Sequence, residues 1–345
     1  MLALHNVDKH YQNGRSSVQA LKNIQLTIET GEMVGFLGRT NSGKSTLARC
    51  MGFLERPSQG NVIFENRTLN LLCEPERRAL RRQIGIITKD PALLLSRSVL
   101  ENITLGFEMH SNAAGPERRN LARPLLEWLE LLEYSDAAVE NLSAFIKQKV
   151  ALARALSMQP QMLLCDDFTA NLDSRSSYRL VQYLLEAKQK FPITVAVLSS
   201  DVEIIKQLAK RMLVLHQGEI VEQGLVADLL ANPQAEATCD LIRSSTRTEL
   251  PHSLRRRLQL QPLENSHPIW RITFKDPGEQ ESVLAYAVQR FQLQLSIVQA
   301  HLENLLDGKL GVMIAEIQGN EEQLSKASHY LSEQGLYNEV LAYVQ

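Results

Sequence analysis

The chain has 345 residues, of which 44% are hydrophobic and 22% are charged, and its formal net charge is −2. This length exceeds what one compact core usually holds, so the composition predicts two domains of an ordinary soluble globular protein. The near-neutral charge supplies no field to hold nucleic acid, and no apolar stretch reaches the roughly 18 residues of a membrane-spanning helix.

Alternating apolar residues at 2–7 and 24–28 predict an opening antiparallel hairpin. The apolar run 33–37 is typical of a buried strand, and residues 45–54 can form a helix after it. From about 91 to 158 the apolar spacing becomes helical. Further strands are expected at 61–64, 84–87, 162–166 and 195–198. Strands that are apolar on both faces favour a parallel sheet covered by helices.

Between the strand 33–37 and the helix lies the sequence Gly38-Arg39-Thr40-Asn41-Ser42-Gly43-Lys44-Ser45, a G-x-x-x-x-G-K-S phosphate loop. Its glycines let backbone N–H groups curl around phosphate oxygens, and the helix N-terminus adds partial positive charge. Lys44 adds a full charge, and Ser45 can place its hydroxyl on a magnesium ion. A chance Gly/Ser turn is the alternative, and the strand–loop–helix context argues against it. The predicted nucleotide contacts are Gly38, Arg39, Thr40, Asn41, Ser42, Gly43, Lys44, Ser45 and Thr46.

A second acidic site follows the apolar strand 162–166. Phosphate-loop enzymes hold magnesium with an aspartate at such a strand end, which is the position of Asp166. Asp167 comes next and can orient or deprotonate an attacking water molecule. The alternative is a helix N-cap pair after a core strand. The phosphate loop favours the nucleotide interpretation, with ATP and Mg²⁺ as the expected ligands.

A polar segment marked by prolines runs from 244 to 268 and predicts a linker between domains 1–243 and 269–345. Its basic run, 255–257, is expected to be a solvated helix face. Beyond the linker, the predicted order is strand, helix, strand, strand, helix, strand, the ferredoxin-like unit. These elements are expected at 270–274, 281–291, 295–298, 310–314, 321–333 and 337–344.

With these motifs in place, the chain resembles the ATP-binding subunits of ABC transporters, and among them those of methionine importers. The segments that carry the likeness are Tyr11, Ala20-Leu21-Lys22-Asn23, Leu54-Glu55-Arg56-Pro57-Ser58-Gln59-Gly60, Arg81-Arg82-Gln83-Ile84-Gly85, Ala153-Arg154-Ala155-Leu156, Leu163-Leu164-Cys165-Asp166 and Gly218-Glu219-Ile220-Val221-Glu222-Gln223-Gly224. The resemblance implies an α/β fold: a P-loop (RecA-like) ABC nucleotide-binding domain with a helical subdomain at about 91–158. It also implies a C-terminal ferredoxin-like, ACT-like α+β regulatory domain.

The resemblance also implies function. Tyr11 would lie against adenine, and Ser143 would contact the nucleotide of a second chain. The protein would form a homodimer, or a heterodimer with another ABC ATPase, and drive a membrane permease. It would sit peripherally on the cytoplasmic face of the inner (plasma) membrane. The four cysteines form no C-x-x-C pair, which suits a reducing cytoplasm. The C-terminal domain would bind a small amino acid such as methionine, and plain dimerisation without a ligand is the alternative.

The residues for hydrolysis depart from the family pattern. The signature L-S-G-G-Q reads Leu142-Ser143-Ala144-Phe145-Ile146, which adds a ring where a partner's phosphate would approach. Lys89 replaces a glutamine, Asp167 a glutamate and Ser200 a histidine. Shortening the acid draws its carboxylate back by roughly 1 Å, which can cost on the order of a hundredfold in rate. Losing a transition-state donor costs a hundred- to thousandfold.

These departures predict weak hydrolysis, with Asp167, Ser200 and Lys89 as the altered catalytic positions. Neutral drift with local compensation is the alternative for each substitution. Lys89 has a long stem and can still reach phosphate. The turn Ala170-Asn171-Leu172-Asp173, where the family has S-A-L-D, suggests that the dimer-facing turn persists. A non-hydrolysing regulator of a transporter is the second functional hypothesis. A soluble phosphate-loop kinase would leave the C-terminal domain unexplained.

Overall fold

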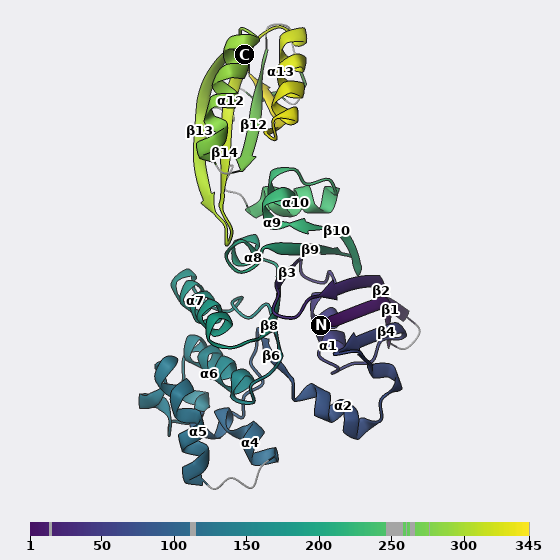
Figure 1. Cartoon of the computed structure of the whole chain (residues 1–345), viewed down its shortest axis with the longest axis vertical. Coiled ribbons are helices and arrows are strands. Elements are labelled where there is room, and N and C mark those ends of the chain that lie inside the picture. The colour runs from purple at the N-terminus through teal and green to yellow at the C-terminus, as the bar shows by residue number, and fades with distance from the viewer. Residues whose placement is uncertain are drawn as a thin grey trace. The chain divides into compact units, whose positions relative to one another are not determined.

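The computed structural model describes residues 1–13, 16–110, 115–245, 258–259, 261–262, 266–275 and 277–344. The chain divides into two compact units, Met1–Gln223 and Gly224–Gln345 (Figure 1). Most of the predicted linker, including the basic run 255–257, lies outside the described residues. In the part of the chain that the structure describes, no helix is both long and apolar enough to cross a membrane.

The first unit opens with an antiparallel sheet in the order β2-β1-β4-β5. Its strands are β1 (Leu2–Asn13), β2 (Ser16–Ile28), β4 (Gln59–Phe64) and β5 (Arg67–Thr68). The register pairs Leu2 with Ile28 and Tyr11 with Val18, so the predicted opening hairpin is confirmed. Tyr11, at the far end of this hairpin, lies near the phosphate loop.

A second, six-stranded sheet has the order β10-β9-β3-β8-β7-β6. Its strands are β3 (Met33–Leu37), β6 (Ile84–Thr88), β7 (Met162–Asp166), β8 (Thr194–Ser199), β9 (Arg211–His216) and β10 (Glu219–Leu225). The pairs β3–β8, β3–β9, β6–β7 and β7–β8 are parallel. Every residue of β3, β7 and β8 is buried, as expected for parallel strands covered on both faces.

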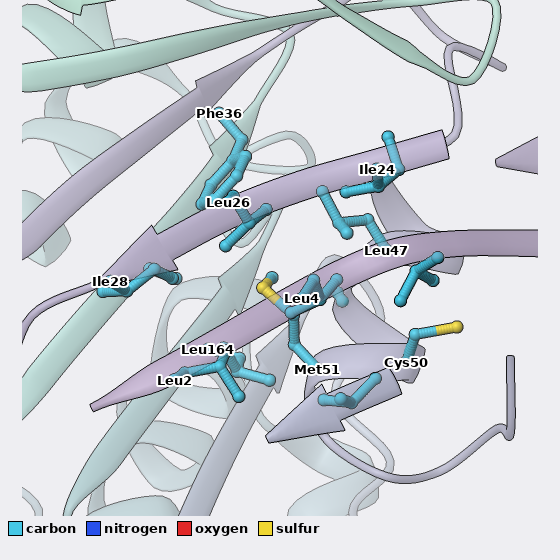
Figure 2. Close-up of a cluster of buried hydrophobic side chains, with 14 of the residues drawn as sticks. Leu2, Leu4, Ile24, Leu26, Ile28, Phe36, Leu47, Cys50, Met51 and Leu164 are labelled. Carbon is cyan, nitrogen blue, oxygen red and sulfur yellow. The ribbon is translucent and has the colours of Figure 1, made fainter. Parts of the chain in front are cut away.

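Helix α1 (Lys44–Met51) packs its apolar side into the core between these two sheets (Figure 2). Leu47 and Met51 are fully buried beside Leu4 of β1 and Phe36 of β3. Burying one such side chain contributes about 1.5–3 kcal/mol. The helix that follows the phosphate loop is therefore anchored along its length. Helix α8 (Val202–Leu208) contacts β3 and β8, and α7 (Ser174–Lys190) contacts α8.

The predicted helical region contains short helices arranged around α6 (Ala144–Ser157). They are α3 (Val99–Ile103), α4 (Leu105–His110) and α5 (Gly115–Trp128), with 3-10 turns at Leu132–Tyr134 and Val139–Asn141; α2 (Glu74–Arg81) and a 3-10 turn at Leu69–Leu71 precede them.

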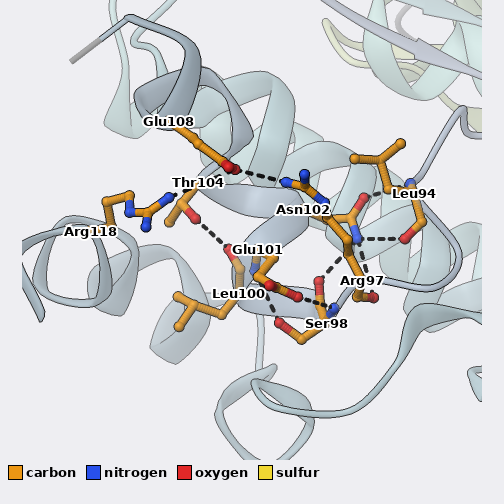
Figure 3. Close-up of polar contacts among 9 residues, drawn as sticks. All are labelled: Leu94, Arg97, Ser98, Leu100, Glu101, Asn102, Thr104, Glu108 and Arg118. Carbon is orange, nitrogen blue, oxygen red and sulfur yellow. Dashed lines mark hydrogen bonds and ion pairs between the residues drawn. The ribbon is translucent and has the colours of Figure 1, made fainter. Parts of the chain in front are cut away.

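Helix α3 begins with a capping box (Figure 3). In it, Ser98 Oγ accepts from the Glu101 N–H and Glu101 Oε2 accepts from the Ser98 N–H. The fully buried Asn102 accepts from the Leu94 N–H at 2.8 Å and donates to the Leu94 carbonyl oxygen at 3.0 Å. One asparagine thereby fixes the loop that leads into this region.

The second unit contains a sheet in the order β11-β15-β12-β14-β13. The β-α-β-β-α-β order is confirmed by β12 (His267–Lys275), α12 (Pro277–Arg290), β13 (Gln294–Asn304), β14 (Lys309–Gln318), α13 (Glu321–Glu333) and β15 (Tyr337–Val344). Helices α12 and α13 cover one face, where Ala287 and Leu331 pack against Trp270 and Ile272. A short strand, β11 (Leu258–Gln259), pairs with β15 as an addition that the sequence did not predict.

Two further helices, α9 (Val226–Ala231) and α10 (Glu236–Ser245), belong to the second unit. Helix α9 contacts β12, and Asp228 forms an ion pair with Lys275. Arg243 of α10 forms another with Glu339 of β15. Helix α9 precedes the predicted domain boundary at 243 and α10 spans it, so the compact unit begins earlier, at Gly224.

Candidate functional site

The phosphate loop joins β3 to α1, and its backbone requires glycine at two positions. A Cβ on Gly38 would lie 2.5 Å from the Leu215 carbonyl oxygen. A Cβ on Gly43 would lie 2.7 Å from the Ala20 carbonyl oxygen, and its φ of 107° is one that other residues rarely adopt. The backbone of Asn41 is also in the left-handed region, with a φ of 66°. Successive amides therefore curve in a way that suits an anion.

Lys44 lies at the centre of this loop and is 4% exposed. Its Nζ donates to the carbonyl oxygens of Gly38, at 2.8 Å, and Arg39, at 3.1 Å, and it is 3.6 Å from Asp167 Oδ2. Among the described residues, Ser42 Oγ is buried without a hydrogen-bond partner. The loop thus holds a buried ammonium group and an unsatisfied hydroxyl group at the start of a helix, as a polyphosphate site requires.

A cleft of about 600 Å³ lies over the loop. Its walls include Tyr11, Thr40, Asn41, Gly43, Lys44, Ser45, Thr46 and Asp167, which the sequence predicted. They also include residues that it did not predict: Val18, Gln19, Ala20, Lys22, Gln217 and Gly218. The turn between β9 and β10 closes one side, where the Gly218 N–H donates to the Ser42 carbonyl oxygen at 2.9 Å. A Gln-Gly pair between two strands was the available signal for this turn.

Asp166, the last residue of β7, is 9% exposed, and its Oδ1 has no partner among the described residues. Burial raises the pKa of Asp166, and the neighbouring Asp167 raises it further. The hydrogen bond with Ser45 and the charge of Lys44 act in the opposite direction. A hydroxyl and an under-satisfied carboxylate are ligands that magnesium prefers, so Ser45 and Asp166 fit the predicted metal site.

We expect Asp166→Asn to raise the melting temperature of the nucleotide-free protein by a few degrees and to abolish the stabilisation that Mg-ATP provides. The raised pKa means that the ionised carboxylate is disfavoured in the folded state, so its penalty is present at neutral pH. The difference in melting temperature between Asp166→Asn and the parent chain should become smaller as the pH falls through the pKa of the Asp166 carboxyl group. Thermal unfolding with and without Mg-ATP measures both effects.

Asp136→Asn, at an exposed ion pair with Arg119, is the matched control and should change neither quantity. A nucleotide-free Asp166→Asn protein less stable than the parent chain would contradict the assignment of an electrostatic penalty to this carboxylate.

Asp167 and Ser200, the predicted positions of the acid and the switch residue, lie together. Asp167 Oδ1 accepts from the Ser200 N–H at 2.9 Å, while Ser200 Oγ is 3.5 Å away. The other carboxylate oxygen of Asp167, Oδ2, lies 3.6 Å from Lys44 Nζ. Asp167 itself has φ 45°. Both carboxylate oxygens are therefore engaged by the protein in this arrangement.

Lys89 is exposed in the loop that follows β6 and, like Ser143, is not among the described residues that line the cleft. The buried Gln148 of α6 donates to the carbonyl oxygens of Thr88, at 3.0 Å, and Lys89, at 2.9 Å. Arg154, further along α6, donates to the Ala92 carbonyl oxygen at 2.6 Å. The loop 88–92 is therefore bound to α6 at both of its ends.

The signature-like segment begins α6, where Ser143 Oγ accepts from the Ile146 N–H at 3.3 Å. The Phe145 ring lies against two cations of its own chain: Lys149 Nζ is 5.3 Å from the ring centroid, and the Arg179 guanidinium is 5.5 Å from it. A cation above an aromatic face is favourable, which explains this placement. The expectation that this ring lies where a partner's phosphate would approach stays a prediction.

Two family models match the chain: the ABC transporter model over residues 21–170 and the NIL domain model over residues 268–340. The methionine import ATP-binding protein MetN of Haemophilus influenzae (strain 86-028NP) is 35% identical over 346 residues, covering 100% of both chains. MetN of Escherichia coli (strain K12) is 31% identical, again covering 100% of both.

Solved structures are similar to the first part of the chain. The ATP-binding cassette MJ0796, in a dimeric post-hydrolysis state bound to ADP and Pi, is 33% identical with a TM-score of 0.61, covering 66% of this chain and 99% of that one. Clostridium perfringens cbiO1 is 27% identical with a TM-score of 0.60, covering 67% and 90%. The chain therefore belongs to the family of methionine import ATP-binding proteins, the ABC transporter ATPases that carry a C-terminal NIL domain.

Proposed function

We propose that the chain is the ATP-binding subunit of an ABC importer for methionine or a related amino acid, acting through a permease at the cytoplasmic face of the membrane. The observation that carries this proposal is a cleft over a phosphate-loop sequence in a chain that aligns end to end with methionine import relatives. The loop amides and Lys44 would hold the phosphates of ATP, and Ser45 and Asp166 would hold Mg²⁺. The metal would supply positive charge that neutralises the phosphates.

A dimer is part of this proposal, because the similar cassette MJ0796 is dimeric in its structure bound to ADP and Pi. In a dimer, the start of α6 with Ser143 would face the nucleotide of the other chain. The Phe145 ring contacts Lys149 and Arg179 of its own chain. The proposal includes both a homodimer and a heterodimer with another ABC ATPase.

Slow hydrolysis is the second part of the proposal. Asp167 is shorter than the family's glutamate, and its two carboxylate oxygens are already engaged by Lys44 and the Ser200 N–H, which would disfavour the orientation of an attacking water molecule. A magnesium-dependent ATPase assay with binding measured in parallel tests this. We expect micromolar binding of ATP with turnover decades below that of a relative with the regular motifs. Brisk hydrolysis by the unmodified chain would refute slow turnover, and absent binding would refute the whole proposal.

The substitutions at Lys89, Asp167 and Ser200 also favour a second candidate: a nucleotide-binding subunit that regulates or stabilises a transporter without hydrolysis. Adding the permease separates the two. An importer ATPase should hydrolyse ATP faster when reconstituted with its permease, whereas a regulatory subunit should bind the permease and leave the rate unchanged.

The second unit offers a site for an apolar amino acid. A groove of about 650 Å³ lies between α12 and strands β13 and β14. Most of its lining is aliphatic or aromatic, including Leu284, Val288, Leu302 and Met313, and Gln289 and His301 add polar groups. A mostly apolar groove with a few polar groups is typical of small-ligand sites. We propose that it binds methionine or a similar amino acid.

We expect L-methionine to raise the melting temperature of the C-terminal domain within the full chain, and Leu302→Arg to abolish this effect. Leu302 is 56% exposed at the groove, so a charged side chain there would oppose an apolar ligand without disturbing the core. Val340→Arg is the matched control: Val340 is 45% exposed in the same sheet, outside the groove lining. Equal loss of the methionine effect in both variants would contradict the groove assignment.

A further inference from the structure

The side chain of Tyr11 is fixed in a way that its resemblance to an adenine-contacting residue does not explain. Tyr11 lies on β1 opposite Val18 of β2, and both line the cleft over the phosphate loop. Among the described residues that line this cleft, Tyr11 is the aromatic one. An aromatic ring beside a polyphosphate site can stack on a nucleotide base. What holds that ring therefore bears on how a base would be recognised.

Glu55 holds the edge of the ring. The Tyr11 hydroxyl donates to Glu55 Oε2, and the Thr46 side chain forms a second hydrogen bond with the same hydroxyl. Burial raises the pKa of Tyr11, as does the bond to Glu55, so the phenol stays a donor. Glu55 is itself anchored, since its Oε1 accepts from Arg49 Nη1 at 3.2 Å and its N–H donates to the Arg49 carbonyl oxygen at 3.2 Å.

These bonds join the ring to α1 at both ends of the helix. Thr46 lies in the first turn, next to the phosphate loop, whereas Arg49 and Glu55 belong to the last turn and the segment after it. The helix that presents Lys44 to phosphate is thus the helix that fixes Tyr11. The distance between a phosphate site and a base platform is then set by one rigid, buried element.

Lys9 holds the face of the ring. Its Nζ is 5.1 Å from the Tyr11 ring centroid, donates to the Arg56 carbonyl oxygen at 2.8 Å and lies 3.4 Å from Glu55 Oε2. The Lys9 side chain is 15% exposed, so the ammonium is largely shielded from water. A cation that is shielded from water is attracted to the negative electrostatic potential of the aromatic face it covers, and it polarises the ring. The opposite face then becomes a better partner for an electron-rich purine ring.

We propose that Lys9 and Glu55 are positioning residues that turn Tyr11 into a one-faced platform for the adenine base. Lys9 covers and polarises one face, Glu55 fixes the ring plane, and the base stacks on the remaining face. This inference rests on the proposed function, because it requires a nucleotide in the cleft. Neither Lys9 nor Glu55 is among the described residues that line the cleft over the phosphate loop, so their contribution should be confined to the base.

The experiment compares Mg-ATP with inorganic tripolyphosphate and magnesium, using calorimetry on the full chain. Tyr11→Ala should weaken ATP binding by about tenfold and leave tripolyphosphate binding unchanged. Lys9→Met keeps the aliphatic stem and should weaken ATP binding roughly two- to fivefold, again without effect on tripolyphosphate. Tyr11→Phe retains the ring without its bond to Glu55 and should fall between the parent chain and Tyr11→Ala. In a Tyr11→Ala background, Lys9→Met should have no further effect.

Lys190→Met is the matched control, since Lys190 lies 5.1 Å from the Trp128 ring centroid, away from the cleft, and its loss should change neither constant. Equal weakening of both ligands by Lys9→Met would overturn the proposal, because Lys9 would then act as a general charge. Unchanged ATP binding in Lys9→Met would overturn it as well. Failure of the unmodified chain to bind either polyphosphate would instead refute the proposed function itself. Circular dichroism verifies that each variant is folded, and Lys9→Gln replaces Lys9→Met if the latter is not.

Discussion

Replacing Lys44 with alanine is expected to weaken the binding of Mg-ATP by at least about a hundredfold. Each hydrogen bond from a charged donor contributes about 1.5–3 kcal/mol, and an ammonium group inside the loop can make two to phosphate oxygens, which corresponds to about a hundredfold or more. The substitution also removes one donor from the carbonyl oxygens of Gly38 and Arg39, although the Arg39 oxygen still accepts from the Ser42 N–H at 3.1 Å. Calorimetric titration of Mg-ATP into the folded variant measures the loss.

Lys22→Ala is the control for a charge at the edge of the same cleft. Lys22 is more exposed and forms an ion pair with Glu219 at 3.1 Å, so its removal should change the affinity by less than about threefold. Equal affinities of the parent chain and the Lys44→Ala variant would remove the phosphate loop from the binding site and, with it, the assignment of the cleft.

The pair of substitutions Asp167→Glu and Ser200→His is expected to raise ATP turnover by about a hundredfold. The glutamate adds one methylene and carries the carboxylate past Lys44 toward the phosphates, and an error of about 1 Å in such a group can cost a hundredfold. The histidine restores a donor with the reach that serine lacks, and one transition-state donor is worth a hundred- to thousandfold. A steady-state assay at saturating Mg-ATP reports the change in kcat.

Each single variant should give less than the pair, because residues that act as a unit are not additive. The affinity for ATP should remain within about threefold of the parent chain, since neither position belongs to the phosphate loop itself. An unchanged kcat in the double variant would mean that the substituted signature segment or Lys89 limits turnover instead.

The parts of the fold that the sequence predicted are those whose signal is contiguous. The phosphate loop is a run of eight residues, and Asp166 follows an uninterrupted apolar strand. The order of elements in the second unit followed from alternating and helical periodicities within short windows. In each case the neighbours in sequence are also the neighbours in space.

The parts that the sequence did not predict depend on contacts between distant segments. Gly218 meets Ser42 only because β9 lies beside β3 in the sheet. The bond from Tyr11 to Glu55 joins β1 to the end of α1 across 44 positions. The contact between the Phe145 ring and the Arg179 guanidinium depends on how α6 packs against α7. Such contacts become visible only in the tertiary structure, because the hydrophobic periodicity of a short sequence window contains no information about them.

The anchoring of the loop 88–92 on α6 has a consequence for how a nucleotide would be sensed. Gln148 and Arg154 fasten this loop to the same helix that Ser143 begins. The loop that contains Lys89 and the helix that begins with the signature-like segment are therefore joined by hydrogen bonds. A displacement of Lys89 would therefore also move the start of α6, where the signature-like segment lies.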